Sequence, residues 1–322
     1  MTSSIVLVLT QPRDLTADLV VGHLADAGVD YARTDLADFP ESASITGYNT
    51  GAWTGWLNTG HRRIRLEDIG AIYYRRPSPF VLAKTMTPIE RSWAQKETRA
   101  GVGGLLMALG GAHWINHPHH NTAATKPMQM IAAGDAGLAT PRSIITNNPA
   151  HAAAFIHSCP NGAIYKTLTG SPHLPGYGIY TSDVTGAGLA ELAGVAQAAH
   201  LFQERLRKAF EVRLTVIGET MFAARIDVDA ASPTGHLDWR SDYPALSYTL
   251  IDTPPDIAER VRAMLDALHL RFAAIDFIVT PGDHRWVLVD VNPNGQWGFV
   301  EEATGAPIAH TIATDLTQGA TR

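Results

Sequence analysis

Two apolar segments near the C-terminus, FAAIDFIVT and HRWVLVDVN, flank the turn sequence PGDH and predict a β-hairpin. If this hairpin folds near Gly282–Asp283, Asp276 and Asp290 fall almost opposite each other on its two strands. Two carboxylates that face each other repel and destabilise a sheet. A divalent cation bound between them would reverse the sign of that interaction. The pair therefore constrains this part of the chain to a sheet that presents two acidic groups on one side.

The residue two positions after Asp290 completes an expected metal site. Asn292 lies on the same face of the strand as Asp290, because side chains alternate along a strand. Two carboxylates and an amide oxygen are hard ligands, which suit Mg²⁺ that also binds phosphate oxygens. In the alternative interpretation, Asp290 and Asn292 only end a strand, and Asp276 is a hydrogen-bonded core carboxylate. That interpretation fits any single aspartate, whereas the three residues together favour a metal.

The composition excludes several classes of protein. The 322 residues are 45% hydrophobic and 17% charged, which is typical of a globular protein with a large core and two or three subdomains. The net charge of −6, with scattered Lys and Arg, argues against a nucleic-acid partner. The single cysteine, Cys159, excludes a disulfide framework within the chain, and no segment approaches the length of a membrane span. We therefore expect a cytoplasmic protein with no membrane partner.

The order of the predicted elements indicates an α/β (α+β) protein in three parts. SIVLVLT, DLTADLVVGHLADAG and VDYARTD are typical of a strand, a helix and a strand. No G-x-G-x-x-G follows the first strand, so a dinucleotide-binding fold has no motif support. The connector GGAHWINHPHHN ends this first unit. We predict an N-terminal α/β domain, a central lobe and a C-terminal lobe with the metal site, over residues 1–115, 116–206 and 207–322.

Two lysines provide positive charge for the phosphates of a nucleotide that Mg²⁺ would carry. Lys126 begins a predicted helix, whose positive dipole end also favours anions. Lys166 lies in the apolar strand AIYKTL, where its amine is costly unless it reaches a partner. In the loop TGSPHLPGYG that follows, glycine N–H groups could bind phosphates, although any Gly/Pro cluster also fits a plain surface loop.

The segment LFQERLRKAFEVRLTVIG joins the two predicted lobes. Such a link could hydrogen-bond an adenine edge through its backbone, with Glu211 holding a ribose. Arg213 lies two residues further on the same face as Glu211, and could reach a phosphate through two parallel hydrogen bonds. The alternative is a solvated charged turn, which would be preferred if this stretch stood alone.

Over residues 110–310 the sequence resembles the ATP-grasp superfamily. The matching motifs are NTAATKPMQMIAAGDAGLATP, IYKTL, FQERL, and AIDFIV followed by LVDVNPNGQW. Within that superfamily the chain resembles the ATP-grasp ribosomal peptide maturases, the graspetide synthetases that include the microviridin ligases. The motifs YYRRPSPF, ARIDVD with DWR, and VNPNGQW carry this closer match. The resemblance implies an ATP-grasp fold, in which an α/β pre-ATP-grasp domain precedes two α+β lobes that clasp ATP.

The resemblance also implies which residues bind the nucleotide and the metal. The nucleotide ligands would be Lys126 and Lys166 at the phosphates, Gln203, Glu204 and Leu206 at the adenine, and Glu211 at the ribose. The Mg²⁺ ligands would be Asp276, Asp290 and Asn292. The catalytic residues, facing the γ-phosphate and an acyl-phosphate, would be Arg213 and Arg225.

The activity that the resemblance implies is ATP-dependent ring formation in a ribosomal precursor peptide made of a leader and a core. ATP phosphorylates an Asp or Glu side chain of the peptide, which gives an acyl-phosphate and ADP. A Ser/Thr hydroxyl or a Lys amine of the same peptide then closes an ω-ester or ω-amide macrocycle, and phosphate leaves. Because the substrate carboxylate and the phosphates are both anionic, local cations are needed. Our candidates for substrate binding are Arg75, Arg76 and Arg240, with Asp238 orienting Arg240.

Several alternatives stay open at this point. A small-molecule carboxylate–amine ligase, of the glutathione-synthetase or amino-acid-ligase type, would use the same nucleotide chemistry on a smaller substrate. A non-catalytic nucleotide-binding module is a second alternative, although a decayed site would be expected to lose some of the residues named above. Arg75 and Arg76 also fit a surface ion-pair site. The expected partner is the precursor peptide, with a leader docking around residues 183–200 and 214–228, and a homodimer is a further option.

Overall fold

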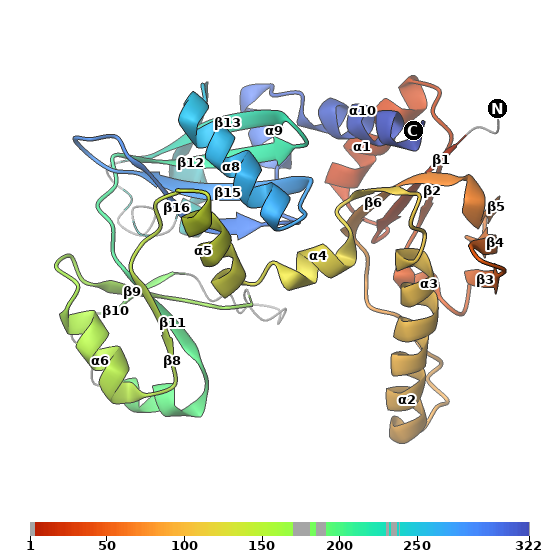
Figure 1. Cartoon of the computed structure of the whole chain (residues 1–322), viewed down its shortest axis with the longest axis horizontal. Coiled ribbons are helices and arrows are strands. Elements are labelled where there is room, and N and C mark those ends of the chain that lie inside the picture. Colours follow the sequence, from red (N-terminus) through yellow and green to blue (C-terminus); the bar gives the residue numbers. More distant parts are fainter. Residues whose placement is uncertain are drawn as a thin grey trace.

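A computed structural model of the chain describes residues 4–169, 181–184, 191–229, 232, 237 and 239–321. In this part of the chain, four sheets build an N-terminal unit at one end of the molecule and two lobes at the other (Figure 1). The three units follow one another along the sequence.

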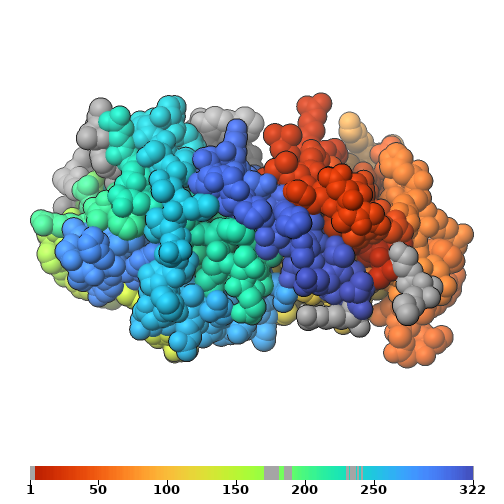
Figure 2. All heavy atoms as spheres, turned by 90° about the horizontal axis from the view of Figure 1, so that it is seen from above, coloured from red at the N-terminus to blue at the C-terminus, as the bar shows by residue number. Residues whose placement is uncertain are grey.

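The N-terminal unit is built on a parallel sheet with the strand order β2-β1-β6-β7. Its strands are β1 (Ile5–Thr10), β2 (Tyr31–Thr34), β6 (Ile69–Arg76) and β7 (His113–Ile115). Strand β1 is buried along its whole length, because the helices α1 (Leu15–Asp26) and α10 (Ile308–Ala320) cover one face of the sheet. The C-terminal helix α10 thus returns to the first unit, and Figure 2 shows the C-terminal segment lying against the N-terminal one.

The second face of this sheet packs against a small antiparallel sheet and a helical segment. The small sheet contains β3 (Ser44–Asn49), β4 (Trp53–Asn58) and β5 (Arg63–Arg65), flanked by the 3₁₀ helices η1 (Leu36–Asp38) and η2 (Leu66–Asp68). The helical segment consists of α2 (Pro88–Thr98), a π-helical turn η3 (Arg99–Gly103) and α3 (Gly104–Met107). Thr87 begins α2 through a capping box with Glu90, which satisfies two backbone groups at the helix start.

The central lobe follows the helices α4 (Pro118–Ala123) and α5 (Lys126–Asp135). Its antiparallel sheet has the order β10-β9-β11-β8, formed by β8 (Ser143–Thr146), β9 (Ala163–Lys166), β10 (Ser182–Val184) and β11 (His200–Glu204). The helix α6 (Pro149–His157) and the 3₁₀ helix η4 (Leu192–Gln197) pack on the face that carries Tyr165 and Phe202. Side-chain alternation therefore places Lys166 on the opposite face.

The C-terminal lobe is an antiparallel sheet in the order β14-β13-β12-β15-β16. Its strands are β12 (Phe210–Ile217), β13 (Thr220–Val228), β14 (Leu246–Ile251), β15 (Phe272–Val279) and β16 (Trp286–Asn292). The helices α8 (Pro255–Ala267) and α5 cover one face, which is lined by Val212, Leu214 and Phe277. The 3₁₀ helices η5 (Trp239–Ser241) and η6 (Tyr243–Ala245) and the helix α9 (Gly298–Thr304) complete the lobe.

The predicted α/β class and β-α-β opening are confirmed, since β1, α1 and β2 follow one another and β1 pairs with β2 in parallel. The predicted domain limits at 115 and 206 stay predictions; they fall at the end of β7 and between β11 and β12. One helix of the predicted third domain, α10, contributes its apolar face to the N-terminal core. Within the described ranges, no helix combines the length and apolar character that crossing a membrane requires.

Candidate functional site

The predicted hairpin is formed by β15 and β16, and its acidic pair lies as predicted, with Asp276 directly opposite Asp290. The ladder shifts by one residue at this point, because the next pair is Phe277 with Leu288, which leaves Val289 as a β-bulge. Without this extra residue, side-chain alternation would turn Asp290 towards the core under α8. The bulge instead places both carboxylates on the face of the sheet that α8 does not cover.

The bulge also supplies a hydrogen-bond acceptor to the central lobe. Lys166 of β9 donates from Nζ to the backbone oxygen of Val289 at 2.8 Å. The Lys166 side chain is buried, and burial lowers its pKa, while the charge of Asp290 opposes that shift. A lysine of one lobe is thus held against the strand that carries the acidic residues of the other lobe.

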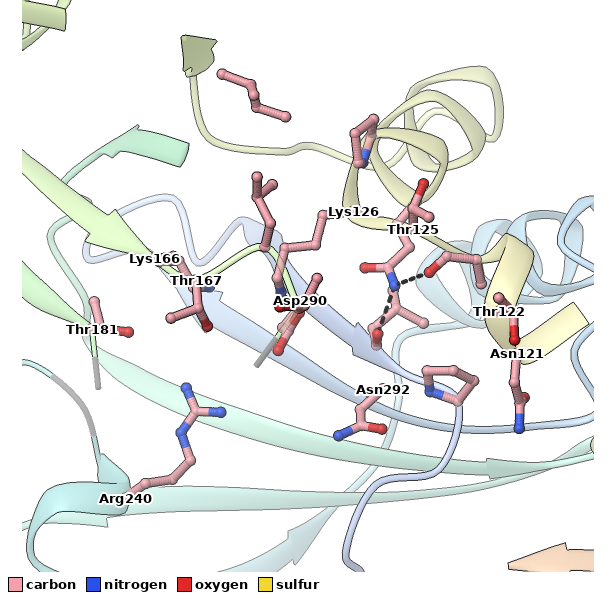
Figure 3. Close-up of a pocket in the computed structure, with 18 residues that line it drawn as sticks. Asn121, Thr122, Thr125, Lys126, Lys166, Thr167, Thr181, Arg240, Asp290 and Asn292 are labelled. Carbon is pink, nitrogen blue, oxygen red and sulfur yellow. Dashed lines mark hydrogen bonds and ion pairs between the residues drawn. The ribbon is translucent and has the colours of Figure 1, made fainter. Parts of the chain in front are cut away.

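A second lysine reaches Asp290 directly. Lys126, the first residue of α5, donates a hydrogen bond to Oδ1 of Asp290, and Figure 3 shows both lysines close to this carboxylate. Burial alone would raise the pKa of Asp290, but Lys126 and Lys166 outweigh burial and hold the pKa well below its usual range. Asp290 is therefore ionised at any working pH, and can bind a cation without first losing a proton.

These groups line a first cavity of about 910 Å³ between the central and C-terminal lobes (Figure 3). Thr122, Thr125 and Thr167 add hydroxyl groups to its wall, and Arg240 and Asn292 lie on the side of the C-terminal lobe. Thr125 is the N-cap residue of α5 but makes no side-chain capping hydrogen bond. The positive end of α5 therefore faces this cavity without a capping side chain, which favours an anion.

Asp276 is shared by two arginines. Arg213 donates from Nη1 to Oδ1 of Asp276 at 2.8 Å, and Nη1 of Arg240 lies 3.8 Å from Oδ2. The Arg213 guanidinium also lies 5.5 Å from the ring centroid of Trp239 and 5.8 Å from that of Phe299. Its Nε is buried and has no hydrogen-bond partner among the described residues. Arg213 is thus fixed on one side and keeps a donor for an anionic ligand.

A second cavity, of about 1250 Å³, lies between α1 and α9. Four arginines line it, namely Arg13, Arg76, Arg213 and Arg240. Arg240 and Asn292 line both cavities, so the two cavities meet at these residues. An anion in the second cavity would therefore lie next to a phosphate in the first, with Arg240 between them.

Gln203 lies on the same face of the central sheet as Lys166, since the pairs Lys166–Leu201 and Ile164–Gln203 are two residues apart. The Gln203 side chain is buried, and its Nε2 donates to Oγ of Ser143 at 3.0 Å. Its Oε1 has no partner in the part of the chain that the structure describes. A buried acceptor without a donor is costly in a folded protein, which indicates a place for a ligand donor.

The other predicted hinge residues have partners within the protein. Glu204 accepts a hydrogen bond from the backbone N of Arg142 at 3.0 Å, and Glu211 forms an ion pair with Lys208 at 2.5 Å. Leu206 lines a separate cavity of about 450 Å³. None of the four predicted hinge residues, Gln203, Glu204, Leu206 and Glu211, is among the described residues that line the first cavity, so their nucleotide role stays a prediction.

The structure contradicts the prediction for Arg225. A two-residue turn joins β12 to β13 and sets the register of the two strands. In this register Arg225 is paired with Val212, the residue before Arg213. Directly paired residues share a face, so Arg225 lies on the side of the sheet that α8 covers, away from Arg213. There its guanidinium donates twice to Asp227, at 2.7 Å each, and lies over the ring of Phe210. Arg225 therefore does not face the cavities.

Arg75 is also placed differently from the prediction. Its side chain is 1% exposed, and its three nitrogens donate to Thr16, to the backbone and side-chain oxygens of Asn294, and to Gln296. Asp14 lies 4.0 Å away and balances the charge. The side chain is buried, so it is neither a surface ion pair nor a substrate ligand. It ties the end of β6 to the loop after β16.

The neighbouring residue, Arg76, does line the second cavity. Burial lowers its pKa, and the charge of Arg75 adds to this effect. Asp238, which we predicted to orient Arg240, lies outside the described residues, as do residues 170–178 of the predicted phosphate-binding loop. Thr169, the one described residue of that loop, lines the first cavity together with Thr167 and Leu168, which precede the loop.

Sequence reasoning missed the role of Asn116. This residue is buried, and its Nδ2 donates to the backbone oxygens of Phe272 and Pro293 at 2.8 Å each. Its Oδ1 accepts from the backbone N of Arg271 and Phe272, also at 2.8 Å. The whole amide is thus used to join β7 to the C-terminal lobe. The connector around Asn116 has the polar composition of a loop, so nothing in the sequence distinguished Asn116 from its neighbours.

Gln129 was missed as well. It is buried on α5, and its Nε2 donates to the backbone oxygens of Val291 at 2.9 Å and Ala124 at 2.7 Å. This contact holds the start of α5, with Lys126, against β16. The sequence did contain a signal for this role, because Gln129 follows Lys126 by three residues and lies on the inner face of a predicted helix.

The oxygen donors of the hairpin fit a hard cation. Asp276 and Asp290 supply carboxylates, and Asn292 supplies an amide oxygen two residues further along β16. Asp276 has two cationic partners, Arg213 and Arg240, and Asp290 is paired with Lys126. Over the described ranges, no three His, Cys, Asp or Glu side chains form a metal-binding group. A metal held here would therefore need the Asn292 amide or ligand oxygens in addition to the two carboxylates.

Comparisons with known proteins follow the same division of the chain. Residues 5–122 match the sequence model of the family described as the MvdD pre-ATP grasp domain. Among curated proteins, none matches the chain.

Solved structures match the chain over nearly its whole length. The macrocyclase MdnC from Microcystis aeruginosa MRC, bound with the precursor peptide MdnA, is 26% identical with a TM-score of 0.84, covering 98% of this chain and 99% of that one. A RiPP-associated ATP-grasp ligase from Chryseobacterium gregarium, in complex with ADP and a leader and core peptide, is 25% identical with a TM-score of 0.87, covering 98% and 97%. The macrocyclase MdnB from Microcystis aeruginosa MRC is 26% identical with a TM-score of 0.81, covering 97% and 99%.

Proposed function

We propose that this chain, an ATP-grasp ligase that carries a pre-ATP-grasp domain of the MvdD kind, closes macrocycles in a ribosomal precursor peptide. The proposal rests on one observation, that two cavities meet at Arg240 and Asn292. The first cavity has two lysines and the carboxylate of Asp290, with Asp276 opposite Asp290 on the neighbouring strand, as a magnesium–nucleotide site requires. The second has the arginines that an acidic side chain of a peptide requires.

The first cavity takes ATP together with Mg²⁺. Lys126 and Lys166 bind the phosphates, and Asp276, Asp290 and Asn292 hold the cation. The cation neutralises phosphate charge during phosphoryl transfer. Lys126 forms an ion pair with Asp290, so Lys126 would leave Asp290 when it binds a phosphate, and the Asp290 carboxylate would then be available to hold the cation.

The adenine and ribose lie towards the hinge between the two lobes. The unpaired Oε1 of Gln203 supports this placement, since the adenine amino group is a donor that could reach a buried acceptor. Glu204 and Leu206 complete the adenine pocket. Glu211 binds the ribose hydroxyls in place of its present partner Lys208.

The second cavity takes the carboxylate that is to be activated. Arg213 and Arg240 flank Asp276, and Arg76 adds a third positive charge. These cations bring an acidic side chain of the peptide to the γ-phosphate, although the chain as a whole carries a net charge of −6. A carboxylate oxygen attacks the γ-phosphorus, the bond from phosphorus to the ADP oxygen breaks, and an acyl-phosphate forms.

Ring closure follows on the same peptide. A Ser/Thr hydroxyl or a Lys amine attacks the acyl carbon and loses its proton, and the bond to the phosphate oxygen breaks. Phosphate leaves with the electron pair of that bond, and an ω-ester or ω-amide remains. Arg213 and Arg240 stabilise the charge that moves onto the phosphate.

The shape of the second cavity favours a peptide over a small molecule. Leu15 and Leu19 of α1 line it, and Leu15 is 82% exposed. An open cavity of about 1250 Å³ that is lined by both apolar side chains and arginines suits an extended chain that carries acidic side chains. A small-molecule ligase would instead enclose its substrate. The chain's one cysteine, Cys159, is unpaired and buried, which suits a reducing compartment, so we place the reaction in the cytoplasm.

The proposal is tested with a candidate precursor, namely the product of a short neighbouring reading frame with a tail rich in Thr or Ser and in Asp or Glu. Incubation with the purified chain, ATP and Mg²⁺ should remove one water per ring, as mass spectrometry detects, and release one ADP per water lost. ADP release from free amino acids, with the peptide left unchanged, would instead show a small-molecule ligase.

Replacing Arg225 by alanine should leave ring closure almost unchanged. Arg225 pairs with Asp227 on the face of the sheet away from the cavities, and exposed substitutions of this kind change stability by about 0.5 kcal/mol or less. The rate of water loss from the peptide and the melting temperature are the measurements. A large loss of rate with an unchanged melting temperature would restore Arg225 to the active site.

Replacing Arg75 by alanine should destabilise the protein and weaken nucleotide binding together. The substitution removes the hydrogen bonds of the buried guanidinium to Thr16, Asn294 and Gln296 and leaves the buried Asp14 without its cation, at a cost of about 3 kcal/mol. It also loosens the loop that follows Asn292. Thermal denaturation and calorimetric titration with Mg²⁺ and ADP measure the two effects. An Arg75→Ala protein that keeps its melting temperature and ADP affinity but loses peptide affinity would support the original substrate role.

A further inference from the structure

One face of the helix α1 lines the second cavity. Its lining residues Leu15, Asp18, Leu19 and Gly22 recur at the three- and four-residue spacing of a single helix face. The opposite face of α1 is buried against the parallel sheet of the N-terminal unit. Leu15 and Leu19 are instead 82% and 46% exposed. The two leucines therefore form an apolar patch on the wall of the cavity.

Three aromatic residues of the C-terminal lobe line the same cavity, namely Trp239, Tyr243 and Phe299. The ring centroid of Trp239 lies 5.8 Å from that of Tyr243 and 5.5 Å from that of Phe299, which is the range of aromatic packing. Trp239 is buried, whereas Tyr243 is 54% exposed. This aromatic cluster thus has a fixed base and an exposed edge, which can pack against a further ring.

The leucines and the aromatic cluster share one cavity because α9 approaches α1 closely. A side-chain carbon added at Gly298 would lie 2.8 Å from Cγ2 of Thr16, which is too short for a real contact. Glycine at this position therefore allows the two helices to meet. Leu15 precedes Thr16 and Phe299 follows Gly298, so an apolar side chain from each helix lines the cavity beside the point of contact.

The aromatic cluster also adjoins the site that we propose for the peptide carboxylate. The Arg213 guanidinium donates to Asp276 and lies within 6 Å of the ring centroids of Trp239 and Phe299. An extended peptide advances about 3.3 Å per residue. A peptide whose acidic side chain reaches Arg213 therefore carries its next one or two residues along the aromatic cluster.

We propose that Leu15 and Leu19 of α1, together with the aromatic cluster, form a subsite for an aromatic side chain of the precursor peptide. This side chain lies within two residues of the acidic side chain that is activated. The inference rests on the proposed function, because the carboxylate held by the arginines fixes where the peptide runs. The occupant belongs to the same peptide as the carboxylate, since the arginines and the apolar groups line a single cavity.

The subsite would select substrates by burial. An aromatic ring removes a large apolar area from water and gains further from packing against other rings, whereas alanine does neither. The arginines bind any acidic side chain, so they cannot distinguish one Asp or Glu of the peptide from another. A neighbouring apolar subsite provides that distinction, and it would decide which acidic residue is activated.

A panel of peptides provides the first arm of the test. In the candidate precursor, each of the two residues on either side of the modified acidic residue is replaced in turn by Phe and by Ala. Mass spectrometry of water loss gives kcat/KM for each peptide with the whole chain, ATP and Mg²⁺. We expect Phe to exceed Ala by at least about ten-fold at one of these four positions. The same exchange six residues away is the peptide control and should have no effect.

A variant of the chain provides the second arm. Leu19→Ser should lower the ratio of kcat/KM between the Phe and Ala peptides by at least about three-fold, and leave the affinity for Mg²⁺ and ADP unchanged. Val81→Ser is the matched control, because Val81 is 53% exposed and is not among the described residues that line either cavity. Circular dichroism verifies that both variants fold.

The outcomes separate this inference from the proposed function. Ring closure at equal kcat/KM for the Phe and Ala peptides at all four positions would overturn the subsite and leave the ligase function standing. A preference for Phe that Leu19→Ser does not reduce would show that the aromatic side chain binds elsewhere, which also overturns the subsite. Ring closure in none of the peptides would overturn the proposed function and this inference with it.

Discussion

We expect the Asp290→Ala variant to form no macrocycle while keeping its fold. Asp290 is the carboxylate at which the two lobes meet, since Lys126 donates to it and Lys166 donates to the residue before it. The lysines hold its pKa well below the usual range, so it binds a cation in its charged form throughout the working pH range. Removing one preorganised charged group from such a site costs about 10²–10³ in kcat.

Mass spectrometry of the precursor after incubation with ATP and Mg²⁺ measures this effect, and circular dichroism verifies the fold. Asp290→Asn is the conservative companion, because it keeps the shape and removes the charge that the cation needs. Asp256→Asn, an exposed aspartate in the first turn of α8, is the matched control and should cyclise normally. Unaltered cyclisation by Asp290→Ala would show that the metal assignment is wrong.

The second large effect is expected for Arg240→Ala, which should lower turnover far more than nucleotide affinity. Arg240 lines both cavities and lies 3.8 Å from Asp276. Its place between the two anions means that it acts on the peptide carboxylate as it meets the γ-phosphate. Loss of such a contact lowers kcat by about 10²-fold, because the interaction is strongest in the transition state.

Two measurements on the Arg240→Ala protein separate an effect on turnover from an effect on nucleotide affinity. Ring closure at saturating ATP gives turnover, and calorimetric titration with Mg²⁺ and ADP gives affinity, which we expect to change by less than about three-fold. Arg225→Ala, on the face of the C-terminal sheet that points away from the cavities, is the matched arginine control. If Arg240→Ala loses nucleotide affinity in equal measure, the residue belongs to the nucleotide site and not to the substrate site.

The acidic hairpin could be predicted because the residues that determine it are close together in the sequence. A turn sequence between two apolar strands places Asp276 opposite Asp290, and the structure confirms this pair. The bulge at Val289 could not be predicted, although it decides which face Asp290 occupies. Sequence periodicity gives only the period of a strand, and one extra residue reverses the direction of every side chain after it.

The prediction for Arg225 was wrong because it also depended on the register between two strands. The turn between β12 and β13 pairs it with Val212, and a turn one residue longer would have placed it beside Arg213. The predicted substrate-binding role of Arg75 was wrong for a different reason. Its partners Asn294 and Gln296 lie 219 and 221 residues later in the sequence, so its burial depends on how the N-terminal unit packs against the C-terminal lobe. Local patterns carry no information about such contacts.

The long-range contacts have a functional consequence. Arg75 and Asn116, both from the N-terminal unit and its connector, hold the loop that follows Asn292 at Asn294 and Pro293. The pre-ATP-grasp domain therefore braces the end of the strand that carries the proposed metal ligands. We expect this domain to be required for nucleotide binding as well as for substrate binding.

The central claim is that magnesium and a nucleotide bind between the lobes, at the face-to-face aspartates and the two lysines. A crystal structure of the chain with AMPPNP and Mn²⁺, whose anomalous signal locates the metal, tests it most directly. We predict a metal peak about 2.1 Å from an oxygen of Asp290, with Asp276 or Asn292 as a further ligand and phosphate oxygens on Lys126 and Lys166. A nucleotide bound elsewhere, or a metal that none of Asp276, Asp290 and Asn292 contacts, would contradict the account.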